Sequence, residues 1–192
     1  MPNPSPSSSD LRRDEISDRL RHYAEGWPGE AATAAEFAAL LAPADDDPFR
    51  RERLAGHFTA SAWLVDAAGE RLLMTHHRKL DRWLQLGGHA DGDRDLAAVA
   101  LREAEEESGL AGLVVAPEIF DLDRHWIPER ADVPGHWHYD VRYVVRATAS
   151  EDFAVSDESH ALAWRRIDAL IAEPGIDPSI VRMAKKWVSR HA

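Results

Sequence analysis

The chain of 192 residues contains no cysteine, which excludes disulfide bonds, thiolate metal ligands and a cysteine nucleophile. Basic residues are also scarce relative to acidic ones: 23 Lys and Arg stand against 34 Asp and Glu, and the formal net charge is -11. Such a surface repels polyphosphate backbones and anionic headgroups, so we expect neither nucleic acid nor a membrane as a partner. A small anionic substrate is compatible with this charge if a metal ion or local Arg and Lys residues reverse the field inside a site.

Long apolar runs are missing as well, because no stretch approaches the roughly 18 residues that a membrane span needs. Residues 1–9 lack the basic start and the apolar stretch of a signal peptide, and they consist mostly of Pro, Ser and Asn. We therefore expect a cytoplasmic protein with a disordered tail over residues 1–9.

The residues that are present suffice for one sizeable core, since 44% of them are hydrophobic. Apolar residues recur at helical spacing within residues 10–50, which predicts a helical extension ahead of a main domain over residues 51–192. Two further helices are predicted to begin near Asp95 and Asp177. The pattern of the main domain also predicts strands over residues 58–65, 71–76, 80–86, 113–120, 137–147 and 162–167. Strands on both sides of a central helix indicate an α/β fold, a sandwich with a mixed sheet.

The most informative segment is residues 87–110, GGHADGDRDLAAVALREAEEESGL. Asp95 is a good N-cap for its helix, and Gly109 suits the left-handed turn that ends one. One face of this helix carries side chains that favour close packing on a sheet, namely Ala97, Ala100, Leu101 and Ala104. Another face carries three carboxylates at offsets of zero, three and four, namely Glu103, Glu106 and Glu107.

Three like charges at this spacing destabilise a helix unless a cation neutralises them. Mg²⁺ prefers oxygen ligands and often binds a few carboxylates together with substrate phosphates. The Gly87-Gly88 pair ahead of the helix lets backbone groups approach the same ion without hindrance from side chains. The alternative is a solvated acidic helix face that binds nothing. Arg102, directly before the glutamates, and the double glycine upstream favour the metal site.

This segment resembles the Nudix box, a pattern of G, five residues, E, seven residues and R-E-U-x-E-E-x-G-U, in which U is a bulky apolar residue. The matching positions are Gly88, Arg102, Glu103, Glu106, Glu107, Gly109 and Leu110. Two positions depart from the pattern: Arg94 stands in place of its first glutamate, and Ala104 replaces a bulkier apolar residue. Asp93 and Asp95, on either side of Arg94, are candidates for the missing acid. The resemblance implies a Nudix-like α/β/α sandwich with a mixed β-sheet.

The resemblance also implies roles for individual residues. Mg²⁺ or Mn²⁺ would be held by Glu103, Glu106, Glu107 and the backbone carbonyl of Gly87, polarising a phosphoryl oxygen and activating a water molecule. Arg102 would orient a glutamate of the box. The implied catalytic set is then Glu106, Glu107, Arg102 and, as the general base, Glu158, with Asp140 as the second choice for the base. For both of these acids, an ordinary loop or strand position without a catalytic role is the alternative.

Residues outside the box are candidates for substrate binding. His136 and His138 fall on one face of a predicted strand, and a zinc site there is the less favoured alternative because strand histidines are more often packed or surface groups. We expect His138 and His89 to form hydrogen bonds to the substrate, and Arg78, in a predicted turn, to contact a phosphate. Three aromatic residues either stack on a nucleobase or belong to the core, namely Trp126, Trp137 and Tyr139.

The leading hypothesis is a metal-dependent hydrolase that cleaves a phosphoanhydride bond in a nucleoside diphosphate linked to another moiety. The substrate is then a small, nucleotide-type molecule, and the existence of a homodimer is left open. One alternative is isopentenyl diphosphate isomerase chemistry on the same fold, which employs a cysteine that this chain lacks. The other alternative is a non-catalytic, nucleotide-sensing or regulatory Nudix-like domain, in which box glutamates are often lost.

Overall fold

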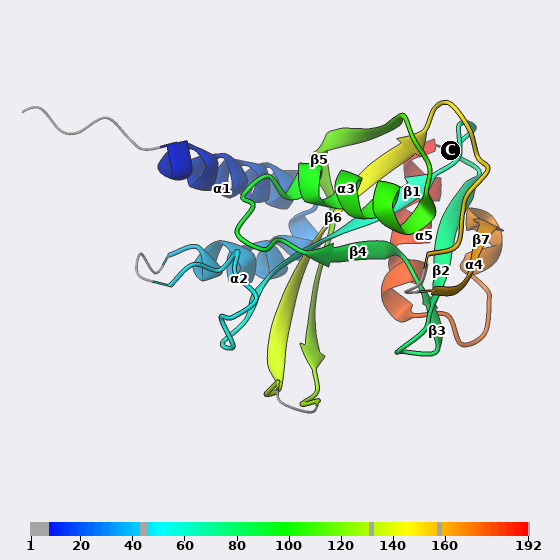
Figure 1. Cartoon of the computed structure of the whole chain (residues 1–192). Helices are drawn as coiled ribbons and strands as arrows, with labels where there is room; N and C mark the ends of the chain where they lie inside the picture. The colour runs from blue at the N-terminus through cyan, green and yellow to red at the C-terminus, as the bar shows by residue number, and fades with distance from the viewer. Residues whose placement is uncertain (1–7, 43–45, 131–132, 157–158, 192) are drawn as a thin grey trace, which may run out of the picture.

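The computed structural model describes residues 8–42, 46–130, 133–156 and 159–191 (Figure 1). The N-terminal part holds helices α1 (Ser8–Gly26) and α2 (Ala31–Leu40), joined by a short 3-10 helix (Pro28–Glu30). The strands are β1 (His57–Val65), β2 (Arg71–His77), β3 (Arg82–Leu84), β4 (Leu86–His89), β5 (Leu113–Ile127), β6 (His136–Ala147) and β7 (Ser159–Arg166). The remaining helices are α3 (Leu96–Ser108), α4 (Ile167–Leu170) and α5 (Pro178–His191). In these ranges, no helix combines the length and the apolar character needed to cross a membrane.

The strands form one mixed sheet that is organised around β1. This strand runs parallel to β6, with His57 opposite His138 and Val65 opposite Arg146, and antiparallel to β4 and β2. The sheet order is β3-β2-β1-β6-β5, with β4 attached to β1 and β7 attached to β2. The mixed sheet expected from the sequence is thereby confirmed.

Alternate side chains of β1 enter cores on opposite faces of the sheet, as the two-residue period of a strand requires. Phe58 and Ala60 pack in a cluster that includes residues of α1, α2 and α3. Trp63 and Val65 belong to another cluster, which includes residues of α4 and α5. Helices therefore cover both faces, and the chain folds as the α/β/α sandwich that the sequence predicts (Figure 1).

Helix α3 follows its predicted bounds closely. The side chain of Asp95 accepts a hydrogen bond from the Ala98 amide at 3.2 Å, and such an N-cap typically contributes about 1 kcal/mol. Gly109 ends the helix with φ of 67°, a left-handed conformation that glycine adopts without a Cβ penalty. Ala100 and Ala104 are fully buried, so the small-residue face lets α3 pack closely on the sheet. Glu103 and Glu107 project from an adjacent face of the helix.

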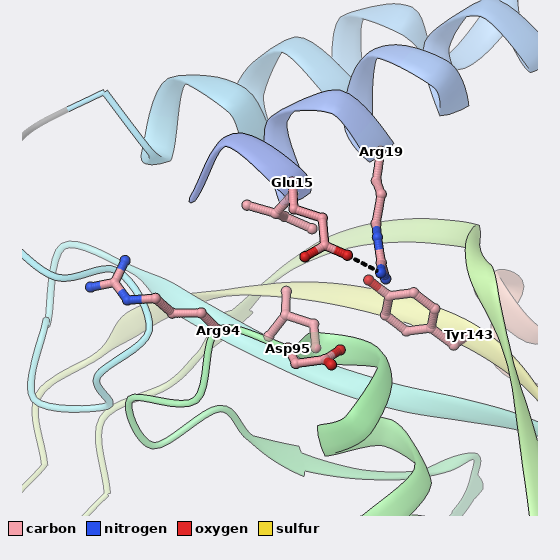
Figure 2. A pocket seen from close by; sticks show the side chains of 7 residues that line it. Glu15, Arg19, Arg94, Asp95 and Tyr143 are labelled. Atoms are coloured by element: carbon pink, nitrogen blue, oxygen red, sulfur yellow. Dashed lines mark hydrogen bonds and ion pairs between the residues drawn. The ribbon is translucent and has the colours of Figure 1, made fainter. Parts of the chain in front are cut away.

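The N-terminal helices pack on the sheet as part of the same core. Ile16 and Leu20 of α1 and Phe37 of α2 are buried in the cluster that contains Phe58. In α1, Arg19 Nη2 donates to Glu15 Oε1 at 2.5 Å. Figure 2 shows these two side chains above Tyr143 of β6 and Asp95, where they line a cavity of about 10 Å³. Helix α1 begins at Ser8, inside the tail expected over residues 1–9, and residues 1–7 lie outside the described residues.

The end of α1 is also tied to α5 across the molecule. Lys186 of α5 is buried, and its Nζ donates to the Tyr23 hydroxyl at 2.7 Å, to Glu30 Oε2 at 2.9 Å and to Asp121 Oδ1 at 2.6 Å. The hydroxyl of Tyr23 in turn donates to Glu30. One ammonium group therefore joins the N-terminal extension, β5 and the last helix.

Two strands differ from the sequence prediction. The strand expected over residues 80–86 is two strands, β3 and β4, and β4 contains Gly87 and Gly88. Glycine weakens a strand intrinsically, so composition alone assigns this pair to a loop, whereas pairing with β1 holds it extended. Strand β5 runs past its predicted end at Phe120 to Ile127, because it pairs with β6 along most of its length.

Candidate active site

The carboxylate face of α3 lies directly over β4. A Cβ atom on Gly88 would overlap the carboxylate of Glu103, and a Cβ atom on Gly87 would overlap Ser61 of β1. Both positions therefore require glycine for the close approach of neighbouring groups, not for an unusual backbone angle. The double glycine clears the space that the Glu103 carboxylate occupies.

The three box glutamates differ in their surroundings. Glu107 Oε1 accepts a hydrogen bond from the Gly87 amide at 3.1 Å, so both Glu103 and Glu107 meet the glycine pair. Glu106 is exposed. The sequence predicts that the three carboxylates converge; within the described part of the chain they share a helix face but are not grouped closely enough for all three side chains to meet at one point.

The donor set fits a hard divalent cation. Carboxylate oxygens and a backbone carbonyl are the ligands that Mg²⁺ prefers, and Mg²⁺ keeps several waters, so it does not require all protein oxygens to lie close together. The glycine pair keeps the backbone of β4 accessible to the ion. Glu103, Glu106, Glu107 and the Gly87 carbonyl are therefore the residues able to hold it.

Arg102 lies between two acids. Its Nη2 is 3.6 Å from Glu103 Oε1, and its Nη1 is 3.6 Å from Asp93 Oδ2. Asp93 therefore reaches the box through Arg102, whereas Asp95 is used as the cap of α3. The guanidinium of Arg94 points away from the glutamates: its Nη2 is 3.2 Å from Asp47 Oδ2, and its Cζ lies 5.0 Å from the ring centre of Phe49. Arg94, at the position where the Nudix box has its first glutamate, thus anchors the loop that contains Asp47 and Phe49.

The other residues predicted to act in catalysis or phosphate binding are Glu158, Arg78 and Asp140. Glu158 lies outside the described residues, directly before Ser159. Arg78 is exposed in the turn after β2, and its Nη2 donates to the Ser159 carbonyl at 3.3 Å. Asp140, the second choice for a base, is buried in β6 and accepts hydrogen bonds from Ser61 at 2.8 Å and Arg142 at 2.7 Å. This environment favours a structural role for Asp140.

The face of the sheet that carries Asp140 is unusually polar. Arg142 is fully buried beside Asp140, Asp121 and Asp123, and these acids outweigh the cost of burial and raise the pKa of the guanidinium. The sequence does show a trace of this network, because polar residues alternate at 57, 59 and 61 and again at 136, 138, 140 and 142. Among these positions, only His136, His138 and Asp140 are candidates from the sequence, and the sequence pattern does not connect them with those of β1.

Three histidines gather at one end of this polar face. His57 of β1, His89 of β4 and His138 of β6 each offer a ring nitrogen, and these nitrogens lie within 4.8 Å of one another. Burial, followed by repulsion from neighbouring charges and histidines, lowers the pKa of His89 to about 4 and that of His138 to about 2. Burial likewise lowers the pKa of His57. All three rings are therefore neutral near pH 7.

The aromatic candidates divide between core and surface. Tyr139 packs edge-on against Phe37, with ring centres 5.2 Å apart, and belongs to the core. Trp126 is half-exposed and contacts Trp137, with ring centres 5.2 Å apart. Arg124 covers Trp137 at 4.6 Å. These contacts favour packing roles over stacking on a nucleobase.

A sandwich with a carboxylate helix over a glycine pair defines a class of metal-using hydrolases. The model of the NUDIX domain matches residues 56–186, and the chain belongs to the Nudix family, as a hydrolase of the Nudix type. The family that the box indicates is thus confirmed.

Solved structures show the same fold. An Ap4A hydrolase from C. elegans, in a binary complex, is 16% identical with a TM-score of 0.55, over 70% of this chain and 96% of that one. The E. coli dihydroneopterin triphosphate pyrophosphohydrolase is 15% identical with a TM-score of 0.55, over 69% and 95%. The NUDIX domain of Shewanella oneidensis NrtR, complexed with ADP ribose, is 16% identical with a TM-score of 0.51, over 81% and 98%. No curated protein matches the chain.

Proposed function

We propose that this protein is a pyrophosphohydrolase that cleaves a phosphoanhydride bond in a nucleoside diphosphate linked to another moiety. The observation that carries the proposal is the position of the Glu103 and Glu107 carboxylates over Gly88 and against the Gly87 amide. Similar structures add support, since they include an Ap4A hydrolase and a dihydroneopterin triphosphate pyrophosphohydrolase. The substrate is expected to be a small, nucleotide-type molecule.

Mg²⁺ or Mn²⁺ is the proposed cofactor. Glu103, Glu106, Glu107 and the carbonyl of Gly87 are the proposed ligands, because they form an all-oxygen set along one helix face and one strand. Bound there, a divalent cation polarises a phosphoryl oxygen and makes a water molecule nucleophilic near neutral pH. The acidic chain thereby gains a positive centre that attracts an anionic substrate.

Other residues of the chain are proposed to position these groups and the substrate. Arg102 is a positioning residue that fixes the Glu103 carboxylate from one side while Asp93 holds the guanidinium from the other. Arg78 is exposed and directed at the start of β7, where it is proposed to contact a phosphate. Glu158, next to that strand, is proposed to accept the proton of the attacking water.

Turnover of a panel of nucleoside diphosphate derivatives with Mg²⁺ and with Mn²⁺ tests the proposal. Glu106→Gln and Glu107→Gln are each expected to lower kcat roughly 100-fold or more, because each removes one charge aimed at the metal. Glu105→Gln is the matched control, since it makes the same change at an exposed position of α3 outside the box set. Turnover unaffected by both box substitutions would sink the metal assignment.

A nucleotide-sensing domain is the second candidate. The NUDIX domain of NrtR, which was crystallised in complex with ADP ribose, matches 81% of this chain. Nucleotide binding measured by calorimetry without turnover in Mg²⁺ or Mn²⁺ would favour this candidate. Turnover that depends on Glu107 would exclude it.

A further inference from the structure

We propose that His57, His89 and His138 form a binding site for a transition-metal ion, with Zn²⁺ as the best match. The site is formed by strands β1, β4 and β6, on the face of the sheet that also carries Thr59 and Asp140. Its ligands are nitrogens, and none of them belongs to the carboxylate set over β4. The proposal therefore goes beyond the proposed hydrolase function and does not depend on it.

The spacing of the three rings fits one tetrahedral ion. The ring centres of His57 and His138 are 4.8 Å apart, those of His89 and His138 are 5.0 Å apart, and those of His57 and His89 are 5.2 Å apart. Imidazoles that bind one tetrahedral Zn²⁺ through bonds of about 2.0–2.1 Å have ring centres roughly 5 Å apart. One ring nitrogen of each histidine already lies within 4.8 Å of those of the other two.

An unsatisfied nitrogen points to a missing ligand. His57 is 1% exposed, and its Nε2 has no hydrogen-bond partner among the residues that the structure describes. Its Nδ1 lies 3.1 Å from the carbonyl oxygen of Arg53, which can only accept a hydrogen bond, so the proton of the neutral ring is on Nδ1. The lone pair of Nε2 is therefore buried and free to bind a metal ion.

A chain of hydrogen bonds also fixes which ring nitrogen of His138 carries the proton. The Nδ1 of His136 donates to the carbonyl oxygen of Pro134 at 2.8 Å, which leaves the Nε2 of a neutral His136 as an acceptor. This Nε2 lies 3.2 Å from the Nε2 of His138, which must then carry the proton. The lone pair of His138 is thereby placed on Nδ1. Hydrogen bonding of the second ring nitrogen to a carbonyl, directly or through a relay, is the usual support of a metal-bound histidine.

The chemistry of the donors selects the metal. Neutral imidazole nitrogens suit Zn²⁺, Co²⁺, Ni²⁺ and Cu²⁺, whereas Mg²⁺ takes oxygen ligands. Three protein ligands leave one tetrahedral position for water or a substrate oxygen, which is the arrangement of catalytic rather than structural zinc sites. His89 and His138 are only partly buried, so solvent can reach the cluster.

Metal titration of the full chain tests this assignment. The protein is freed of metal with a chelator and then saturated with Mg²⁺ to fill the carboxylate site. Co²⁺ is titrated next, because its visible absorption reports tetrahedral nitrogen coordination. Zn²⁺ is added last, in competition with the bound Co²⁺. We expect one equivalent of Co²⁺ per chain and its displacement by one equivalent of Zn²⁺. Absence of a stoichiometric tetrahedral signal would overturn the proposal.

Substitutions locate the ion. His57→Gln and His138→Gln are each expected to weaken Co²⁺ binding by roughly 100-fold or more, with an unchanged far-UV circular dichroism spectrum. Loss of a residue that only supports a metal ligand already weakens binding roughly 10–100-fold, so loss of a ligand itself should have at least that effect. His138→Gln is the variant that keeps the test valid if the buried His57 proves essential for folding. His22→Gln, which changes an exposed histidine of α1, and Glu107→Gln are expected to keep the signal. Loss of the signal in Glu107→Gln, or its retention in His138→Gln, would refute the assignment.

Discussion

Strand β4 lies between two sets of proposed metal ligands of opposite character. On one side, the Glu103 carboxylate of α3 lies over Gly88. On the other side, His89 lies close to His57 of β1 and His138 of β6. The first set offers carboxylate oxygens, which suit Mg²⁺, whereas the second offers neutral imidazole nitrogens, which suit Zn²⁺. The two faces of one strand can therefore select different metal ions through the chemistry of their donor atoms.

A methyl group added at Gly88 should disturb only the carboxylate side of β4. Gly88→Ala places a methyl group where the Glu103 carboxylate lies, and we expect hydrolysis to fall roughly 100-fold, since a displacement of about 1 Å at a reacting centre has an effect of that size. Steady-state kinetics measures the change, and Co²⁺ titration is expected to show the histidine site still loaded. Gly29→Ala, at a position with open space around it, is the control. Equal activity of the two variants would break the proposed contrast.

The buried network beside the histidines should dominate stability. Asp140→Asn removes one charge from a buried ion pair with Arg142, and we expect the free energy of unfolding to fall by about 3 kcal/mol. Urea unfolding measures the loss. Asp168→Asn, which breaks an exposed pair with Arg166, is expected to leave stability unchanged. A loss of similar size in both variants would show that burial does not distinguish the two pairs.

Arg102 offers a finer test of the carboxylate side. Lysine keeps the charge but lacks the planar fork whose Nη1 and Nη2 face Asp93 and Glu103, so Arg102→Lys should orient the Glu103 carboxylate less firmly. We expect kcat to fall roughly 10-fold with little change in KM, because the residue positions a metal ligand and does not touch substrate. Arg21→Lys, an exposed pair on α1, serves as the control. A rise in KM at constant kcat would instead assign Arg102 to substrate binding.

Lowering the pH should reduce the free energy of unfolding gradually and by less than the substitutions above, through the acids of the polar face. Burial opposes the ionisation of Asp123, but the hydrogen bond from His125 and the charges of Arg142 and Arg182 outweigh it and hold the pKa well below its usual range. The folded protein thus stays ionised there when the unfolded chain takes up a proton near pH 3.8, so this stabilisation is complete above that pH and is lost below it. Urea unfolding from about pH 6 to pH 3 should show a shallower loss in Asp123→Asn. Parallel curves for the two proteins would contradict the assignment.

Local signals explain what the sequence predicts well. The bounds of α3 follow from a cap at Asp95 and a glycine at Gly109, both of which act within one helical turn. The box residues follow from fixed spacing along one helix. The close approach of Glu103 to Gly88 is seen only in the structure, although the glycine pair already indicates that neighbouring groups come near the backbone there.

Non-local pairing explains what the sequence does not predict. His57 joins His138 because β1 and β6 are parallel partners, and no pattern within either segment encodes that register. Antiparallel pairing with β6 likewise extends β5 to Ile127, beyond the last residue that the sequence pattern predicts to be in the strand. The role of Arg94 depends on contacts with Asp47 and Phe49, more than forty residues upstream, and is equally invisible in the box itself.

The contacts of Lys186 have a consequence for biosynthesis. Its partners Tyr23 and Glu30 leave the ribosome long before it does, since Lys186 follows Tyr23 by 163 positions. During translation the first helix is therefore made long before its ammonium partner, and the link between α1 and α5 can form only once α5 has been synthesised.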